Sequence, residues 1–286
     1  MPPARSGPFP YSAMPGRAPL RWPNGARIAV WVVPNIESFA LDEPIAGGTG
    51  TVPDVPAWSV REYGARIGVF RIMDVLRRHG VRGTVALNAD VCGAYPEVVA
   101  ATLDLGWELM GHGVTNTRRL SAVADEAVVV RETFERIERA TGTRPVGWLS
   151  PGLQETWDTL DHLAASGARY VADWTVDDQP IWLSAGGTRL VGVPYTFELN
   201  DKPAYERMGR TPDEFAATIR RQFDVLYAES ATSGRVMAIA LHPYLSGYPH
   251  RIGAIDDALG YVRSHDGVWL ATGREIADAF REAMRG

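Results

Sequence analysis

The 286-residue sequence lacks the features that mark several common classes of protein. Its single cysteine, Cys92, excludes an intramolecular disulfide and a cysteine-based zinc site, and a chain without disulfides is typical of a reducing compartment. The longest apolar run, residues 28–33, is far shorter than the ~20 residues that a membrane-spanning helix needs. The formal net charge of -5 gives no electrostatic reason to bind nucleic acid or an anionic membrane. We therefore expect a cytoplasmic protein whose partner is a small molecule rather than nucleic acid or a membrane.

The composition is that of an ordinary globular protein, with 45% hydrophobic and 22% charged residues. Residues 1–26 are rich in proline, glycine and arginine and contain no apolar segment of signal-peptide length. We interpret them as an extended N-terminal leader, followed by a single domain over residues 27–286. Gly47, Gly48, Gly50, Pro44 and Pro53 predict a long functional loop within residues 38–58.

Apolar, β-branched runs alternate with amphipathic stretches along most of the chain. The predicted strands are residues 28–33, 84–87, 108–110, 146–149, 170–172, 190–193, 236–241 and 268–270. Helical spacing of apolar residues predicts helices between them, and the segment Thr211-Pro212-Asp213-Glu214 has the composition of a helix start. This alternation favours an α/β fold with a parallel sheet and outer helices. We predict a distorted (β/α) barrel with about seven or eight parallel strands.

Polar residues follow nearly every predicted strand, where barrel enzymes place their chemistry. For each of these residues alone, a structural role is more common than a catalytic one. A histidine after a strand usually makes structural hydrogen bonds, and an aspartate pair in a loop is usually a solvated turn. Their coincidence predicts a catalytic site. These residues are Asn35, Glu37, Asn88, Asp90, His112, Asn116, Ser150, Asp173, Trp174, Asp177, Asp178, Tyr195, Glu198, Asn200, Asp201 and His242.

Several motifs resemble those of the polysaccharide-deacetylase superfamily, which has a NodB-homology barrel. They are Gly106-Trp107-Glu108-Leu109-Met110-Gly111-His112-Gly113, Arg144-Pro145-Val146-Gly147-Trp148 and, most specifically, Leu241-His242-Pro243. The resemblance covers roughly residues 28–280 and is closest to the branch of metal-independent allantoinases, cyclic imidases and some peptidoglycan deacetylases. It implies hydrolysis of an N-acyl or cyclic amide bond. It also implies a homo-oligomer, a tetramer in the imidase and allantoinase relatives.

The sequence departs from the metal-dependent pattern of that family, in which an aspartate and a His-x-x-x-His pair bind the metal and a second aspartate is the base. Asn116 replaces the second histidine of the pair that begins at His112, and Asn35 stands where the base aspartate is expected. Glu37 falls near the metal-aspartate position. Glu37, His112 and Asn116 would make a weak zinc site, because a neutral amide oxygen is a poor ligand for zinc. The cofactor is accordingly either zinc or none.

Three functions remain open. In the first, the protein hydrolyses a small cyclic amide or imide, or a related N-acyl compound. Glu37 holds or deprotonates the attacking water, and His112 and Asn116 orient the water or the substrate carbonyl. His242 protonates the leaving nitrogen. This requires that burial, from neighbours such as Phe39 and Trp174, raise the pKa of Glu37. The second function is zinc-dependent deacetylation of an amino sugar or peptidoglycan, and the third is ligand binding without catalysis. Asp178 or Asp173 would orient the catalytic groups. The predicted substrate-binding residues are Asn35, Asn116, Trp174, Asp173, Asn200 and Tyr195.

Overall fold

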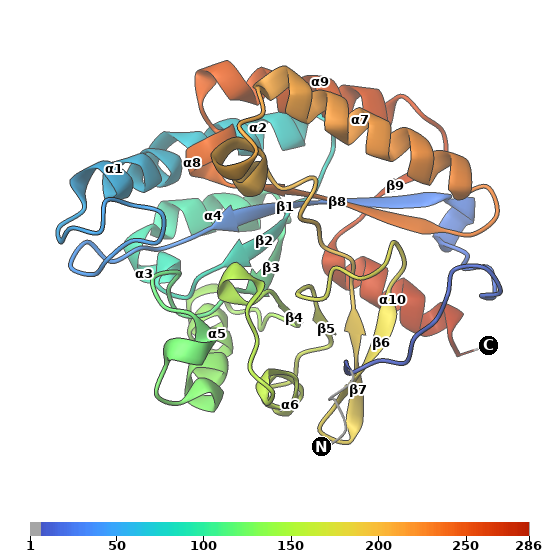
Figure 1. Cartoon of the computed structure of the whole chain (residues 1–286), viewed down its shortest axis with the longest axis horizontal. Helices are drawn as coiled ribbons and strands as arrows, with labels where there is room; N and C mark the ends of the chain where they lie inside the picture. The colour runs from blue at the N-terminus through green and yellow to red at the C-terminus, as the bar shows by residue number, and fades with distance from the viewer. Residues whose placement is uncertain (1–6, 286) are drawn as a thin grey trace.

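The predicted alternation of strands and helices is present in a computed structural model, which describes residues 7–285 (Figure 1). Its strands are β1 (Ile28–Ile36), β2 (Thr84–Leu87), β3 (Glu108–Gly111), β4 (Gly147–Trp148), β5 (Tyr170–Val171), β6 (Ile181–Ala185), β7 (Thr188–Gly192), β8 (Arg235–Leu241) and β9 (Val268–Leu270). They form one curled sheet in the order β6-β7-β5-β4-β3-β2-β1-β8, with β9 also paired to β1. Every pairing is parallel except the β6–β7 hairpin. The prediction of a distorted barrel of about eight parallel strands is confirmed.

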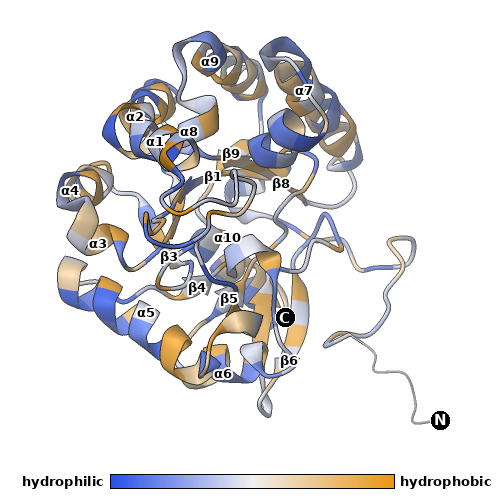
Figure 2. Ribbon diagram, turned by 60° about the vertical axis from the view of Figure 1, so that its left-hand side comes forward, coloured by the Kyte–Doolittle hydropathy of each residue, from blue (hydrophilic) through white to orange (hydrophobic). Residues whose placement is uncertain are grey.

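Most of the helices lie outside the sheet and form a broken ring around it (Figure 2), whereas the last one packs against the interior residues of the strands through Ile276, Ala277 and Phe280. They are α1 (Val55–Tyr63), α2 (Val69–Arg78), α3 (Val91–Ala94), α4 (Pro96–Asp104), α5 (Glu126–Thr141), α6 (Thr159–Ala165), α7 (Pro212–Glu229), α8 (Pro243–Ser246), α9 (Pro249–Arg263) and α10 (Gly273–Ala283). Two single-turn π-helices, η2 (Gly64–Gly68) and η5 (Pro203–Arg207), join neighbouring segments. Thr211 caps α7 in a capping box with Glu214, as the sequence predicted.

Side chains alternate between the two faces of β1, which is buried along its whole length. Ile28, Val30 and Val32 face the helical layer that contains α2, α7 and α9. The intervening residues Ala29, Trp31 and Val33 face the interior of the curled sheet, where they pack with residues of the other strands. The interior is therefore a packed core, and a site can form only beyond the ends of the strands.

Two elements and part of the leader differ from what the pattern predicted. The loop predicted over residues 38–58 ends earlier, because α1 begins at Val55. Strand β6 was not predicted; it pairs with β7 across a Gly186-Gly187 turn. Residues 1–6 of the predicted leader lie outside the described residues, but Trp22 is buried and its Nε1 donates to the carbonyl of Arg235 (3.0 Å). Within residues 7–285, no helix is long and apolar enough to cross a membrane.

Candidate active site

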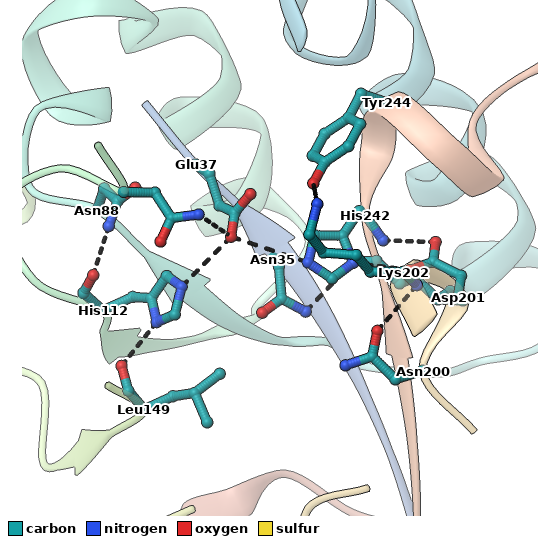
Figure 3. Close-up of polar contacts among 12 residues, drawn as sticks. Asn35, Glu37, Asn88, His112, Leu149, Asn200, Asp201, Lys202, His242 and Tyr244 are labelled. Carbon is teal, nitrogen blue, oxygen red and sulfur yellow. Dashed lines mark hydrogen bonds and ion pairs between the residues drawn. The ribbon is translucent and has the colours of Figure 1, made fainter. Parts of the chain in front are cut away.

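The interior face of the sheet changes from apolar to polar where the strands end. On β1 the inward series Ala29, Trp31, Val33 continues to Asn35 and then to Glu37. The same spacing of two residues leads from Met110 to His112, from Ala240 to His242 and from Val193 to Tyr195. Because the strands are parallel, their carboxyl ends meet at one end of the sheet, and these side chains converge there (Figure 3).

The converging side chains surround a cavity of about 150 Å³. A cavity of roughly this size holds a ligand as large as benzene. Its wall consists of Asn35, Glu37, His112, Asn116, Arg119, Leu149, Gly152, Leu153, Gln154, Tyr195, Phe197, Asn200, Lys202, Pro203, Arg207 and His242. The cavity has room for one small ring or one acyl group.

Glu37 lies between the two histidines of the cavity (Figure 3). Its Oε1 accepts a hydrogen bond from Asn116 Nδ2 (2.7 Å) and lies 3.5 Å from His112 Nε2 and 3.8 Å from His242 Nε2. Burial opposes ionisation of Glu37, but the nearby charges of His242, His112 and Lys202 outweigh it and lower its pKa to about 2. The prediction that burial raises this pKa is therefore wrong.

The orientation of His112 is fixed by its backbone surroundings. His112 Nδ1 lies 2.6 Å from the carbonyl oxygen of Leu149; since a carbonyl can only accept, Nδ1 carries a proton. Asn88 donates to the backbone carbonyl of His112 and accepts from the backbone N–H of Ser38, which ties the two loops together. His112 Nε2 and Glu37 Oε2 are both buried and have no hydrogen-bond partner within residues 7–285. Two buried polar atoms are thus available to a ligand.

His242 is held by a buried carboxylate, Asp201. His242 Nδ1 lies 2.7 Å from Asp201 Oδ1, while Asp201 Oδ2 accepts from the backbone N–H of His242 and from Ser246 Oγ, both at 2.7 Å. This arrangement places the proton on Nδ1 and points Nε2 toward Glu37. Asp201, which is fully buried, is therefore the partner of His242.

The prediction that Asp178 orients the catalytic groups is wrong. The backbone carbonyl of Asp178 accepts from Val236, at the amino end of β8, whereas His242 follows the carboxyl end of the same strand. The segment between β5 and β6 runs past the amino end of β8, where Gln179 Nε2 also donates to the carbonyl of Gly234 (2.7 Å). There the adjacent Asp177 forms an ion pair with Arg17 (2.6 Å).

Of the predicted substrate-binding residues, Asn35, Asn116, Tyr195 and Asn200 line the cavity. The Tyr195 hydroxyl accepts from Asn35 Nδ2 (3.1 Å) and Asn200 Nδ2 (3.4 Å), and burial raises its pKa, so it remains a neutral hydroxyl.

Asp173 and Trp174 are not part of the cavity wall, contrary to prediction. Asp173 accepts from the backbone N–H of Ser150 (2.7 Å), and Trp174 donates to Glu155 (3.1 Å) and packs edge-on against Phe9. Asp173 lies one residue out of phase with the inward-facing Ala172 and is not among the residues that line the cavity.

The predicted metal ligands do not form a zinc site. A catalytic zinc needs three protein ligands, and Glu37 Oε2 and His112 Nε2 could supply two of them. The third, Asn116, donates through Nδ2 to Glu37 and accepts at Oδ1 from Arg119 (3.1 Å). Turning the amide would set its oxygen against a carboxylate and its NH₂ against a guanidinium, so Oδ1 is the atom that accepts from Arg119, and a neutral amide oxygen in this position is a weak zinc ligand. Within residues 7–285, no cluster of three or more His, Cys, Asp or Glu could hold a metal.

A curled (β/α) barrel with acid–base side chains around one small cavity defines a hydrolase site. The polysaccharide deacetylase family model matches residues 62–171. A probable polysaccharide deacetylase from Pseudomonas aeruginosa has 30% identity and a TM-score of 0.81, over 91% of this chain and 93% of its own. This chain belongs to the polysaccharide deacetylase family, whose members are C–N hydrolases.

Two further relatives extend over nearly the whole chain. The structure of Puue allantoinase is 26% identical, with a TM-score of 0.85 over 94% of this chain and 95% of its own. A Schizosaccharomyces pombe protein, assigned as a polysaccharide deacetylase, is 28% identical over 91% of this chain and 92% of its own length. Both enzyme names therefore occur among relatives of similar distance.

Sequence reasoning missed Arg119, Lys202 and Arg207, and it named Asp201 among the polar residues that follow strands without assigning it a role. Asp201 follows a predicted strand, but its role depends on the loop that runs beside β8, where Asn200 bridges to Ala240. Arg119 lies on a loop, whereas Lys202 and Arg207 lie in the short helical segment that contains η5, and no spacing signal separates these cations from surface residues.

Proposed function

We propose that this chain hydrolyses an amide C–N bond in a small cyclic amide or imide, or in a related N-acyl compound, without a bound metal. The observation that carries the proposal is the pair of imidazoles whose Nε2 atoms face one cavity on either side of Glu37 (Figure 3). Amide hydrolysis needs a base for the attacking water and an acid for the departing nitrogen. Two histidines in fixed orientations supply both.

His112 is the base in this proposal. A carboxylate with a pKa near 2 is a weak proton acceptor near neutral pH, so Glu37 does not fill this role. Water that donates one hydrogen to His112 Nε2 and the other to Glu37 Oε2 would pair both buried acceptors and turn a lone pair toward the substrate. As the oxygen bonds to the carbonyl carbon, one proton passes to His112, and Glu37 stabilises the imidazolium that forms.

His242 is the acid. As the C–N bond breaks, the nitrogen takes a proton from His242 Nε2, while Asp201 holds the Nδ1–H (2.7 Å). After each turnover His112 releases its proton to solvent and His242 takes one up again, while Glu37 Oε1, within 4 Å of both Nε2 atoms, remains ionised beside them. The balance is the addition of one water; a cyclic amide gives a carboxylate and a nitrogen product within one molecule.

The size of the cavity and one relative favour a ring as substrate. About 150 Å³ suits a five- or six-membered ring. The relative named as an allantoinase matches almost the whole chain. A second candidate is deacetylation of an N-acetyl amino sugar, which the names of the Pseudomonas aeruginosa and Schizosaccharomyces pombe relatives favour; the same base and acid would act on the acetamide.

The test is hydrolysis of succinimide, hydantoin, dihydrouracil, allantoin and N-acetylglucosamine oligomers by the full chain, followed by chromatography of the products. His112→Asn and His242→Asn should each lower kcat by about 100-fold or more on whichever compound the wild type hydrolyses. His162→Asn, on α6 and outside the cavity, is the matched control and should have wild-type kcat. Turnover close to wild type in both site variants, or no turnover of any compound, would refute the proposal.

A further inference from the structure

The cavity carries more positive charge than hydrolysis of a neutral amide needs. Three cationic side chains line it, Arg119, Lys202 and Arg207, against one carboxylate, Glu37. Glu37 already faces His112 and His242. Asp201, which does not line the cavity, is hydrogen-bonded to His242. The charge of the two arginines is therefore not matched by any carboxylate of the cavity wall.

The partners of these cations within residues 7–285 leave much of their charge unmatched. Arg207 is exposed at the last position of η5 and has neither a hydrogen bond nor an ion pair among the described residues. Arg119 has one hydrogen bond there, to the neutral oxygen of Asn116. Lys202 is the only one in an ion pair, with the half-exposed Glu206 (2.9 Å), and it also donates to Tyr244 (2.9 Å).

The backbone also makes room for one of these groups. Gly152, which lines the cavity, has a φ of +68°, and a Cβ there would lie 2.7 Å from the guanidinium carbon of Arg119. Any other residue at this position would push the guanidinium away from the cavity wall. Arg119 follows β3 while Lys202 and Arg207 follow β7, so two separate loops bring cations to one small space.

We infer that the substrate carries a carboxylate close to the amide that is cleaved, and that Arg119, Lys202 and Arg207 bind it; this rests on the proposed function. Guanidinium groups match a carboxylate with paired, charge-assisted hydrogen bonds, and the lysine adds a point charge. A neutral ring or a neutral sugar would leave Arg119 and Arg207 without a counter-charge in the complex.

Matched pairs of compounds test the inference. Dihydroorotate is dihydrouracil with a carboxylate, and hydantoin-5-acetate is hydantoin with a carboxymethyl group. We expect kcat/KM of the wild type to be at least about tenfold higher for the anionic member of a pair, the scale of one charge-assisted hydrogen bond. Arg207→Gln should lower that ratio about tenfold, and Arg66→Gln, which removes the same charge from the exposed η2, should leave it unchanged.

Equal or higher kcat/KM for both neutral compounds, or an unchanged ratio in Arg207→Gln, would overturn the inference. If the wild type hydrolyses none of the four, titration calorimetry separates the two proposals. Tighter binding of the anionic members, weakened in Arg207→Gln but not in Arg66→Gln, would support the anion site while the hydrolytic function fails. Equal affinity for both members of each pair would overturn the anion site.

Discussion

Asp201→Asn is the substitution that isolates the contribution of the buried carboxylate to the acid. In the wild type, Asp201 Oδ2 accepts from two donors, the His242 backbone N–H and Ser246 Oγ, while Oδ1 accepts from His242 Nδ1. An asparagine keeps the first two bonds only if its oxygen takes the Oδ2 position. Its NH₂ then faces Nδ1, which must give up its proton and accept. The imidazolium form loses its carboxylate, and the remaining proton moves to Nε2.

The expected cost in kcat is about 100- to 10,000-fold. A hydrogen bond to a charged group contributes about 1.5–3 kcal/mol, which corresponds to roughly 10- to 100-fold. The wrong tautomer costs more, about 10,000-fold when the aspartate behind the histidine of a serine protease is replaced. The assay is kcat for the best substrate of the wild type, together with thermal unfolding to verify that the variant is folded.

A matched control is available on α7, where exposed Asp224 accepts from the Tyr261 hydroxyl (2.7 Å). Asp224→Asn removes the same charge and should have wild-type kcat. A folded Asp201→Asn variant with kcat within about threefold of wild type would show that Asp201 does not control the acid, and the assignment of His242 would fall with it.

Two further predictions concern stability and pH. The pKa of Glu37 is lowered in the fold to about 2. Its charged form therefore stabilises the folded protein above pH ~4.5, and this stabilisation is lost as the pH falls toward 2. Relative to Glu37→Gln, the wild type should lose about 3 kcal/mol of unfolding free energy over this range, measured by urea denaturation. Burial and the neighbouring Asp173 raise the pKa of Glu155. The folded protein then holds a proton that the unfolded chain releases, so unfolding free energy should fall as the pH rises above ~4.5. Glu155→Gln should reduce that fall between pH 4 and pH 8; an equal fall in both proteins would contradict the account.

Most of the fold could be predicted because the strands are continuous apolar runs. The run from Ile28 is buried on both faces, and such runs are typical of a central parallel strand. Strand β6 could not be recognised in the same way, since its pattern is only partly buried and includes an exposed serine. Its turn, Gly186-Gly187, was the available signal for a hairpin.

The site residues that could be predicted are those that continue the alternation of side chains along a strand. Glu37, His112 and His242 stand two residues beyond inward-facing strand positions, so their convergence follows from strand ends alone. Asp201 and Arg207 are brought to the site by the segment that follows β7. The spacing of residues in the sequence does not predict the path of such a segment. The direction of the pKa shift of Glu37 was mispredicted because burial raises this pKa while nearby positive charge lowers it. The sequence shows neither how deeply the carboxyl group is buried nor how close the charges lie.

Activity after removal of metal tests the central claim most directly. Protein purified without chelators is compared with protein dialysed against EDTA, with metal content measured by elemental mass spectrometry and hydrolysis assayed on the same substrate. Asn116 Oδ1 accepts a hydrogen bond from Arg119 and is a weak third ligand for zinc. We therefore predict that chelated protein with less than about one tenth of a metal per chain keeps its full turnover. Loss of turnover on chelation, with recovery on adding one equivalent of zinc, would contradict it.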